Sequence, residues 1–209
     1  MIKVFIADDH AIVRQGLKQI VSDAAEMVVV GEAGNGGDTL HQLRQCEADV
    51  LVLDIAMPVK GGVDVLKQVR KEKPSLPTLI LSIYPEEQYA VRLIRAGAFG
   101  YITKESAPEQ LLKAIRTLAQ GRKFITPYVA ELLANEVSAG PQTPHDALSD
   151  REHDVFLMLA SGKTVSQIAG DLALSVKTIS TYRVRILEKM KLCSNAELMH
   201  YAFKNHLVE

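Results

Sequence analysis

The chain has 209 residues, of which 47% are hydrophobic and 23% charged, and its formal net charge is −1. This composition excludes a disordered chain, and no apolar run approaches the roughly 20 residues needed to cross a bilayer. The balanced charge by itself points to no class of partner. The two cysteines, Cys46 and Cys193, lack metal-ligand spacing, and Asp8 and Asp9 near the start do not fit a secretory leader. We therefore expect a cytoplasmic protein without membrane association.

Short β-branched runs alternate with amphipathic helical patterns over the first part of the chain. Strands are expected at Lys3–Ala7, Met27–Ala33, Val50–Leu53, Thr78–Leu81 and Gly100–Thr103, and helices at Ala11–Ser22, Gly37–Gln45, Val63–Lys73, Glu86–Ala96 and Pro108–Gln120. Runs such as VLVL and TLIL are apolar on both faces, as buried parallel strands require. The alternation predicts an α/β fold with a doubly wound, five-stranded parallel sheet, flavodoxin-like, in the order 2-1-3-4-5.

The remainder of the chain is expected to be a small all-α domain. Thr126-Pro127 opens a short helix to about Val137, and Ala139–Pro144 has the composition of a linker. Further helices are expected from Ser149 to Gly162, at Val165–Leu172, at Val176–Met190 and at Asn195–Asn205. Three pairs have the spacing of capping boxes: Ser106 with Glu109, Ser149 with Glu152, and Thr164 with Gln167.

Acidic side chains follow two of the expected strands. Asp8 and Asp9 come directly after the first strand, and Asp54 directly after the third. Because the carboxyl ends of neighbouring parallel strands meet at one edge of a sheet, these carboxylates are expected to converge. Such a set suits Mg²⁺, whose charge would offset the mutual repulsion of the carboxylates. Ser82 and Lys104, at the ends of the fourth and fifth strands, would donate to a phosphoryl group beside the metal.

A simpler interpretation exists for each of these aspartates taken alone. Aspartate after a strand is also a common turn residue and helix N-cap. The combination of five suitable side chains at successive strand ends favours the phosphoryl site. His10 follows the acidic pair and could approach the site, but it is interpreted as a residue at the start of a helix.

These motifs resemble the receiver domain of two-component response regulators over about residues 1–122. The matching residues are Asp8-Asp9, Asp54-Ile55-Ala56-Met57-Pro58 with Gly62, Ser82, and Tyr101-Ile102-Thr103-Lys104. The resemblance implies that Asp54 accepts a phosphoryl group from a sensor histidine kinase. It also implies Mg²⁺ held by Asp8, Asp9, Asp54 and the backbone carbonyl of Ala56, phosphoryl contacts from Ser82 and Lys104, and a switch pair of Ser82 and Tyr101. Glycine at position 62 would give its loop backbone freedom.

Basic residues gather toward the end of the chain. Residues 141–172 carry 2 basic and 5 acidic side chains, whereas residues 173–209 carry 6 basic and 3 acidic ones. Val165–Leu172, a short turn and Val176–Met190 have helix-turn-helix lengths, and the second helix of that motif enters the major groove. Its expected buried face is Val176, Ile179, Ile186, Leu187 and Met190, and its expected DNA-contacting residues are Lys177, Thr178, Ser180, Thr181, Val184 and Arg185. Periodicity alone fits an ordinary bundle helix with a solvated basic face nearly as well.

A second resemblance covers roughly residues 147–207. Leu148-Ser149-Asp150-Arg151-Glu152, Val155-Phe156, Ile168-Ala169, Leu174-Ser175-Val176-Lys177-Thr178-Ile179 and Lys189-Met190 resemble the LuxR-type helix-turn-helix. With the receiver, this makes the chain similar to the NarL/FixJ-type response regulators, which regulate transcription. Ser180 and Val184 stand where some relatives carry basic groups, and Glu188 adds a negative charge. The base preference is therefore not carried over, and the salt dependence of DNA binding is expected to be shallow.

The sequence thus predicts a receiver domain at 1–122, a linker helix and flexible linker at 123–146, and a LuxR-type DNA-binding domain at 147–209. Expected partners are a sensor histidine kinase, double-stranded promoter DNA, a second copy of the chain when phosphorylated or on DNA, and RNA polymerase. The chain would act as no enzyme beyond promoting its own phosphorylation and dephosphorylation. Two alternatives stay open: an aspartyl-phosphate phosphohydrolase, and a receiver whose helical domain binds protein rather than DNA.

Overall fold

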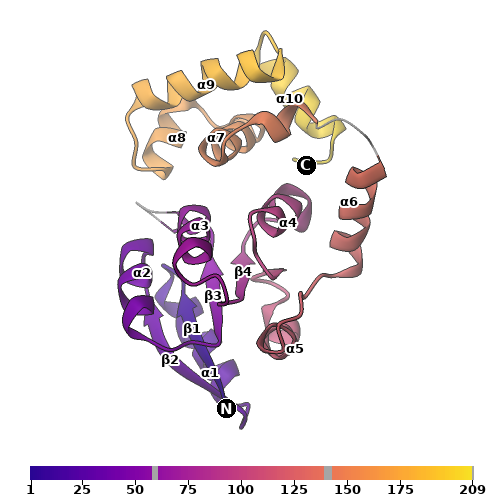
Figure 1. Cartoon of the computed structure of the whole chain (residues 1–209). Helices are drawn as coiled ribbons and strands as arrows, with labels where there is room; N and C mark the ends of the chain where they lie inside the picture. The colour runs from indigo at the N-terminus through magenta and orange to yellow at the C-terminus, as the bar shows by residue number, and fades with distance from the viewer. Residues whose placement is uncertain (58–60, 139–142, 209) are drawn as a thin grey trace. The chain divides into compact units, whose positions relative to one another are not determined.

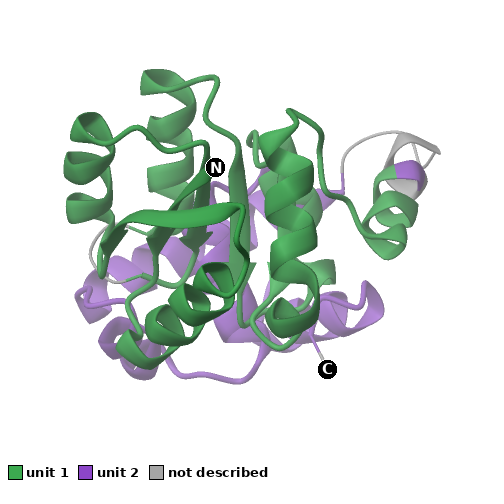
Figure 2. Cartoon of the chain, turned by 90° about the horizontal axis from the view of Figure 1, so that it is seen from below, with its two compact units in different colours: residues 1–133 green, residues 134–209 purple. Residues whose placement is uncertain are grey.

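The computed structural model describes residues 1–57, 61–138 and 143–208 (Figure 1). Pro58 of the receiver motif and residues 139–142 of the expected linker lie outside the described residues. The chain divides into two compact units, Met1–Leu133 and Ala134–Glu209, which Figure 2 colours separately. This division falls inside the helix that begins at Pro127, whereas the sequence places a boundary near residue 143.

The first unit is built on one parallel sheet. Its strands are β1 (Ile2–Ala7), β2 (Met27–Ala33), β3 (Val50–Asp54), β4 (Thr78–Ser82) and β5 (Gly100–Thr103), in the order β2-β1-β3-β4-β5. The intervening helices are α1 (Ala11–Ser22), α2 (Gly36–Gln45), α3 (Gly62–Glu72), α4 (Glu86–Arg95) and α5 (Ala107–Ala119). The predicted fold class and strand order are confirmed, and the ends of the expected elements shift by only a residue or so.

Helices cover both faces of this sheet. On one face, α1 and α5 bury Leu17, Leu111 and Ile115 against alternate strand residues such as Val4 and Val52. The intervening strand residues, including Phe5, Leu51 and Leu53, point the other way and are equally buried, beneath α2, α3 and α4. The sheet is thus apolar on both sides, and polar chemistry is confined to its edges.

After α5 the chain returns along β5 before α6 (Pro127–Ser138) begins. Phe124 forms a parallel bridge with Gly100, and its N–H donates to the Phe99 carbonyl at 2.8 Å. Thr126 caps α6 as predicted, because its hydroxyl accepts the Val129 N–H at 3.2 Å. The start of α6 is therefore fixed to the sheet by a short extended segment.

The second unit is helical throughout its described residues. Its elements are η1 (Pro144–Ala147), α7 (Asp150–Ala160), α8 (Val165–Asp171), α9 (Val176–Met190) and α10 (Asn195–Lys204). Their core contains the buried side chains Phe156, Ile168, Ile179, Ile186 and Leu198. The short η1 turn, in a stretch that the sequence assigns mostly to the linker, carries its own capping box between Thr143 and Asp146.

Two of the three expected capping boxes form, at Ser149 with Glu152 and at Thr164 with Gln167. The prediction for Ser106 and Glu109 is wrong. Ser106 has a helical backbone conformation (φ −84°, ψ −6°), whereas a capping residue needs an extended one. Its hydroxyl instead donates to the Thr103 carbonyl at 3.1 Å.

The expected buried face of α9 is correct except at its first residue. Ile179, Ile186 and Met190 are buried and Leu187 is half-buried, but the Val176 side chain is 50% exposed. Helical periodicity fixes the side of the helix on which a residue lies. It does not fix how far along the helix axis the neighbouring helices extend, and they leave Val176 at the start of α9 uncovered.

Glu152 joins the start of α7 to the end of α9. Its carboxylate is almost fully buried and accepts the Ser149 N–H at 2.8 Å, the Ser149 hydroxyl at 2.9 Å and the Lys189 ammonium. Burial alone would raise the pKa of Glu152, but the hydrogen bonds from Lys189 and Ser149 bring that pKa below its usual value of 4.5. The ionised carboxylate is therefore the form that stabilises the helical core.

Replacing Glu152 by Gln should lower the free energy of unfolding of the second unit at neutral pH by about 1–2 kcal/mol. Because the folded pKa lies below the unfolded one, the stabilisation is complete above pH 4.5 and is lost as the pH falls through the folded value. Calorimetric unfolding of the full chain should show a difference in stability between the wild type and Glu152→Gln at pH 7, and this difference should shrink at acidic pH. The control is Glu188→Gln, on the exposed side of α9, and an equal loss in both variants would contradict the role of Glu152.

Candidate functional site

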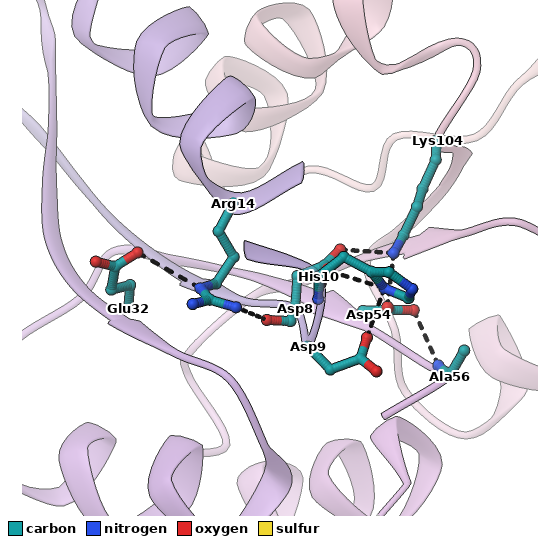
Figure 3. Close-up of polar contacts among 8 residues, drawn as sticks. All are labelled: Asp8, Asp9, His10, Arg14, Glu32, Asp54, Ala56 and Lys104. Atoms are coloured by element: carbon teal, nitrogen blue, oxygen red, sulfur yellow. Dashed lines mark hydrogen bonds and ion pairs between the residues drawn. The ribbon is translucent and has the colours of Figure 1, made fainter. Parts of the chain in front are cut away.

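The carboxyl edge of the sheet gathers the acidic residues. Ala7 lies beside Leu53 in the pairing of β1 with β3, so Asp8 and Asp54 extend from neighbouring strands to the same edge. Asp8, Asp9, His10 and Asp54 each offer a ligand atom within 4.8 Å of the others (Figure 3). The convergence of the three aspartates is as expected from the sequence, and Asp8 and Asp54 are completely buried.

Lys104 is the cation of this acidic cluster. Its ammonium lies 2.7 Å from a carboxylate oxygen of Asp8 and 2.7 Å from one of Asp54, and only 13% of the side chain is exposed. The other oxygen of Asp54 accepts the Ala56 N–H at 2.9 Å. One lysine thus faces two buried carboxylates, with Asp9 close by, which leaves an excess of negative charge suited to a hard divalent cation.

The protonation behaviour of the cluster follows from its burial. Burial raises the pKa of Asp54 above its ordinary value, although the Ala56 N–H and the Lys104 ammonium act in the opposite direction. Burial alone would lower the pKa of Lys104, but its hydrogen bonds with Asp54 and Asp8 raise it overall. Lys104 is therefore held as a cation beside a carboxylate whose charge is costly to bury without further positive charge.

His10 and Arg14 belong to the surroundings of the cluster. The sequence allows His10 to approach the site without assigning it a role there, and it does not indicate Arg14. His10 occupies the N-cap position of α1 without capping it through its side chain, and its ring lies 2.7 Å from an Asp9 oxygen. Arg14 donates to the Asp8 carbonyl at 2.8 Å and lies 3.6 Å from Glu32 (Figure 3). The adjacency of His10 to the acidic pair was a usable signal, whereas the contacts of Arg14 depend on how α1 packs.

The hydroxyl side chains lie along β4 and β5. Ser82, completely buried at the end of β4, accepts the Tyr84 N–H at 3.0 Å. Tyr101 is 1% exposed and donates its hydroxyl to the Tyr84 carbonyl at 2.7 Å. Burial raises the pKa of Tyr101, despite a hydrogen bond with Ser82. Ser82 and Tyr101 therefore meet at the loop between β4 and α4, and the tyrosine ring points inward.

Gly62 lies against the acidic edge, but the predicted reason for the glycine is wrong. It is not among the described glycines with positive φ, so backbone freedom is not what the position requires. A Cβ here would come within 2.2 Å of the Asp54 carbonyl oxygen and 2.5 Å of the Ile55 Cα. The loop after β3 is packed directly against the first residue of α3, and only glycine leaves room for it.

In the second unit, most of the residues expected to contact DNA lie on the exposed side of α9. Lys177, Ser180, Thr181, Val184 and Arg185 are exposed, and Thr178 is half-buried. The Thr178 N–H bonds to the capping hydroxyl of Ser175, while the Thr181 hydroxyl bonds back to the Lys177 carbonyl. With Val184 about half exposed, this face combines two cations, hydroxyls and a short apolar group.

Two family models match the chain in succession. Residues 4–116 match the response regulator receiver domain, and residues 146–202 match the bacterial regulatory proteins of the luxR family. The chain belongs to the NarL/FixJ-type response regulators. The resemblance seen in the sequence is confirmed, and this response regulator is a transcription regulator rather than an ordinary enzyme.

Relatives align with this response regulator along its whole length. Response regulator GacA of Pseudomonas aeruginosa is 37% identical, with 100% of this chain and 99% of the relative covered. Response regulator UvrY of Escherichia coli K12 is 32% identical, with 99% and 96% covered. RcsB of Salmonella enterica serovar Typhimurium, bound to promoter P1flhDC with phosphomimetic BeF3⁻, aligns with a TM-score of 0.67 and 28% identity over 96% of this chain and 97% of that one. Among the described residues, no helix of this chain is long and apolar enough to span a membrane.

The packing at Gly62 gives a testable difference between two glycines. Gly62→Ala should lower the free energy of unfolding of the first unit by about 1–3 kcal/mol, because the added methyl meets backbone atoms that cannot move aside cheaply. Gly16→Ala is the control, since that glycine is exposed within α1 with nothing near its missing Cβ. This variant should gain about 1 kcal/mol from helix propensity. Urea unfolding of both variants checks the opposite signs, and a neutral Gly62→Ala would contradict the packing argument.

Proposed function

We propose that this response regulator is a phosphorylation-activated, DNA-binding transcriptional regulator, with Asp54 as the phosphoacceptor and a sensor histidine kinase as the donor. The observation that carries the proposal is the buried Asp54 carboxylate, held by the Lys104 ammonium and the Ala56 N–H at the acidic edge of the sheet. We assign residues 1–122 to the receiver, 123–146 to the linker and 147–209 to the DNA-binding domain.

Asp54 is suited to nucleophilic attack on phosphorus. An oxygen of its carboxylate forms the new P–O bond while the P–N bond of a phosphohistidine breaks, and the leaving imidazole keeps the electron pair. Fixed contacts from Ala56 and Lys104 orient the carboxylate, and Lys104 stays positioned to neutralise the transferred oxygens. Asp8, Asp9, Asp54 and the Ala56 carbonyl would hold Mg²⁺, which supplies the positive charge that the developing phosphoryl charge requires.

Ser82 and Tyr101 would convert phosphorylation into a change of the β4–α4 loop. The Ser82 hydroxyl bonds the Tyr84 N–H, and a phosphoryl group on Asp54 would compete for that hydroxyl. Tyr101 holds the carbonyl of the same residue, so both peptide groups of Tyr84 are tied to the switch pair. The loop would have one arrangement with Ser82 bonded to Tyr84 and another with Ser82 bonded to the phosphoryl group. Phosphorylation would shift the population toward the second.

The exposed side of α9 is the proposed DNA-contacting surface. Lys177 and Arg185 would contact phosphates, while Thr178, Ser180, Thr181 and Val184 face the bases. RcsB has been solved on promoter DNA, in one structure as two dimers on two parallel DNAs. By analogy we propose that this chain binds double-stranded promoter DNA as a homodimer with paired recognition helices, and that RNA polymerase is its further partner.

Phosphorylation is tested by intact mass after incubation with acetyl phosphate and Mg²⁺. The wild type should gain one phosphoryl group, and the gain should disappear in Asp54→Asn or when Mg²⁺ is chelated, because both the nucleophile and the cation are required. Asp23→Asn, at the exposed C-terminal end of α1, is the matched control and should be phosphorylated like the wild type. An adduct that persists in Asp54→Asn would assign the acceptor elsewhere.

DNA contact is tested by the salt dependence of binding to a duplex selected from a random library by the phosphorylated protein. Lys177→Ala and Arg185→Ala should each reduce the slope of log K against log salt by about 1, since each removes one phosphate contact. Lys163→Ala is the control, because Lys163 is not part of α9 and forms an ion pair with Asp171 of α8. Unchanged slopes in both α9 variants, together with retained binding of a protein partner, would favour the alternative of a protein-binding output domain.

A further inference from the structure

The start of α6 contacts the first turn of α4. The Thr126 hydroxyl donates to a Glu86 carboxylate oxygen at 2.9 Å and at the same time accepts the Val129 N–H of its own helix. Val129 is 1% exposed, so one side of this first turn of α6 is buried. Glu86 therefore accepts a hydrogen bond from the residue that caps α6. The first unit ends within this helix, at Leu133.

A second contact runs parallel to the first. Tyr128 of α6 is hydrogen-bonded to Glu87, the residue after Glu86, and partial burial and this bond raise the pKa of Tyr128 to about 12. The tyrosine thus stays protonated and donates to the carboxylate at any physiological pH. Two consecutive glutamates of α4 consequently hold two residues of the α6 first turn.

Only Pro85 separates Glu86 from the residue held by the switch pair. Tyr84 donates its N–H to Ser82 and accepts the Tyr101 hydroxyl through its carbonyl. Its ring also packs on Tyr89 of α4, with ring centroids 5.1 Å apart. The proline ring fixes the φ of Pro85, here −66°, so the backbone between Tyr84 and Glu86 can rotate little. A displacement of the Tyr84 peptide groups therefore also displaces the start of α4.

We propose that the hydrogen bond between Glu86 and Thr126 is a latch through which the phosphorylation state of Asp54 sets the position and stability of the linker helix α6. The path runs from Ser82 and Tyr101 through Tyr84 to Glu86 and on to Thr126. Each step is a hydrogen bond, except that Pro85 joins Tyr84 to Glu86 through the backbone. The latch rests on the proposed function, because it needs a phosphoryl group to move the Tyr84 loop. Thr126 and Glu86 are positioning residues, and neither belongs to the acidic cluster.

The latch is tested by hydrogen exchange of the α6 amides in the full chain, with and without acetyl phosphate and Mg²⁺. In the wild type, phosphorylation should change the protection of α6 by about tenfold, within the usual range of coupling between two sites. Glu86→Ala and Thr126→Val should abolish this change, and Thr126→Ser, which keeps the hydroxyl, should restore it. Glu109→Ala is the control for removing a carboxylate from the first turn of a helix, and it should respond like the wild type.

Intact masses of the same samples report the phosphoryl adduct, so a failure of the proposed function is recognised independently of the latch. An adduct on Asp54 with an α6 response that is the same in Glu86→Ala as in the wild type would overturn the latch and leave the phosphoacceptor assignment intact. Loss of the response in Thr126→Ser as well would also overturn it, since the hydroxyl would then not be the coupling group. A double variant of Glu86→Ala with Thr126→Val should lose no more than either single one, as expected for two ends of one bond.

Discussion

Two buried carboxylates that share one lysine are the constraint on which the first unit depends. Asp8 and Asp54 have no solvent exposure, and the ammonium of Lys104 lies 2.7 Å from each. Two buried carboxylates with a single ammonium between them destabilise the fold unless a further positive charge binds. The sheet is therefore least stable at the edge where ligands bind in folds of this kind. Burial of the apolar faces of the sheet offsets this destabilisation. The parallel strand order brings the charged side chains together at one edge.

The same edge also connects Asp54 to residues beyond the acidic cluster. Ser82 and Lys104 end neighbouring strands, and the Lys104 N–H bonds the Ser82 carbonyl at 2.7 Å. A group added to Asp54 must therefore be accommodated by residues that are already bonded to one another and to the Tyr84 loop. The backbone of Asp54 cannot shift toward α3, because Gly62 is packed closely against the Asp54 carbonyl. The Tyr84 N–H, which donates to the Ser82 hydroxyl, links this edge to the loop that leads into α4.

Charge is used differently in the second unit. There a single carboxylate, Glu152, is matched by hydrogen bonds from Ser149 and Lys189, and it stabilises the helices around α9. Lys177 and Arg185, the cations proposed to contact DNA, are different from Lys189, so the proposed binding and the stability rest on different residues. That separation allows Lys177 and Arg185 to be replaced without disturbing the buried face formed by Ile179 and Ile186.

The sequence by itself determined the local features of this protein. Strand runs such as VLVL, the capping boxes at Ser149 and Thr164, and the placement of Asp8 and Asp54 at strand ends depend on residues a few positions apart, which a pattern can reveal. Tertiary structure alone decided that Gly62 is needed for space, that Val176 is exposed, that Arg14 joins the acidic edge, and that Glu86 meets Thr126 across 40 positions. These features depend on how far neighbouring elements extend and how closely they pack. Periodicity along one chain gives the side of a helix or strand that faces inward, but not the atoms that it meets there.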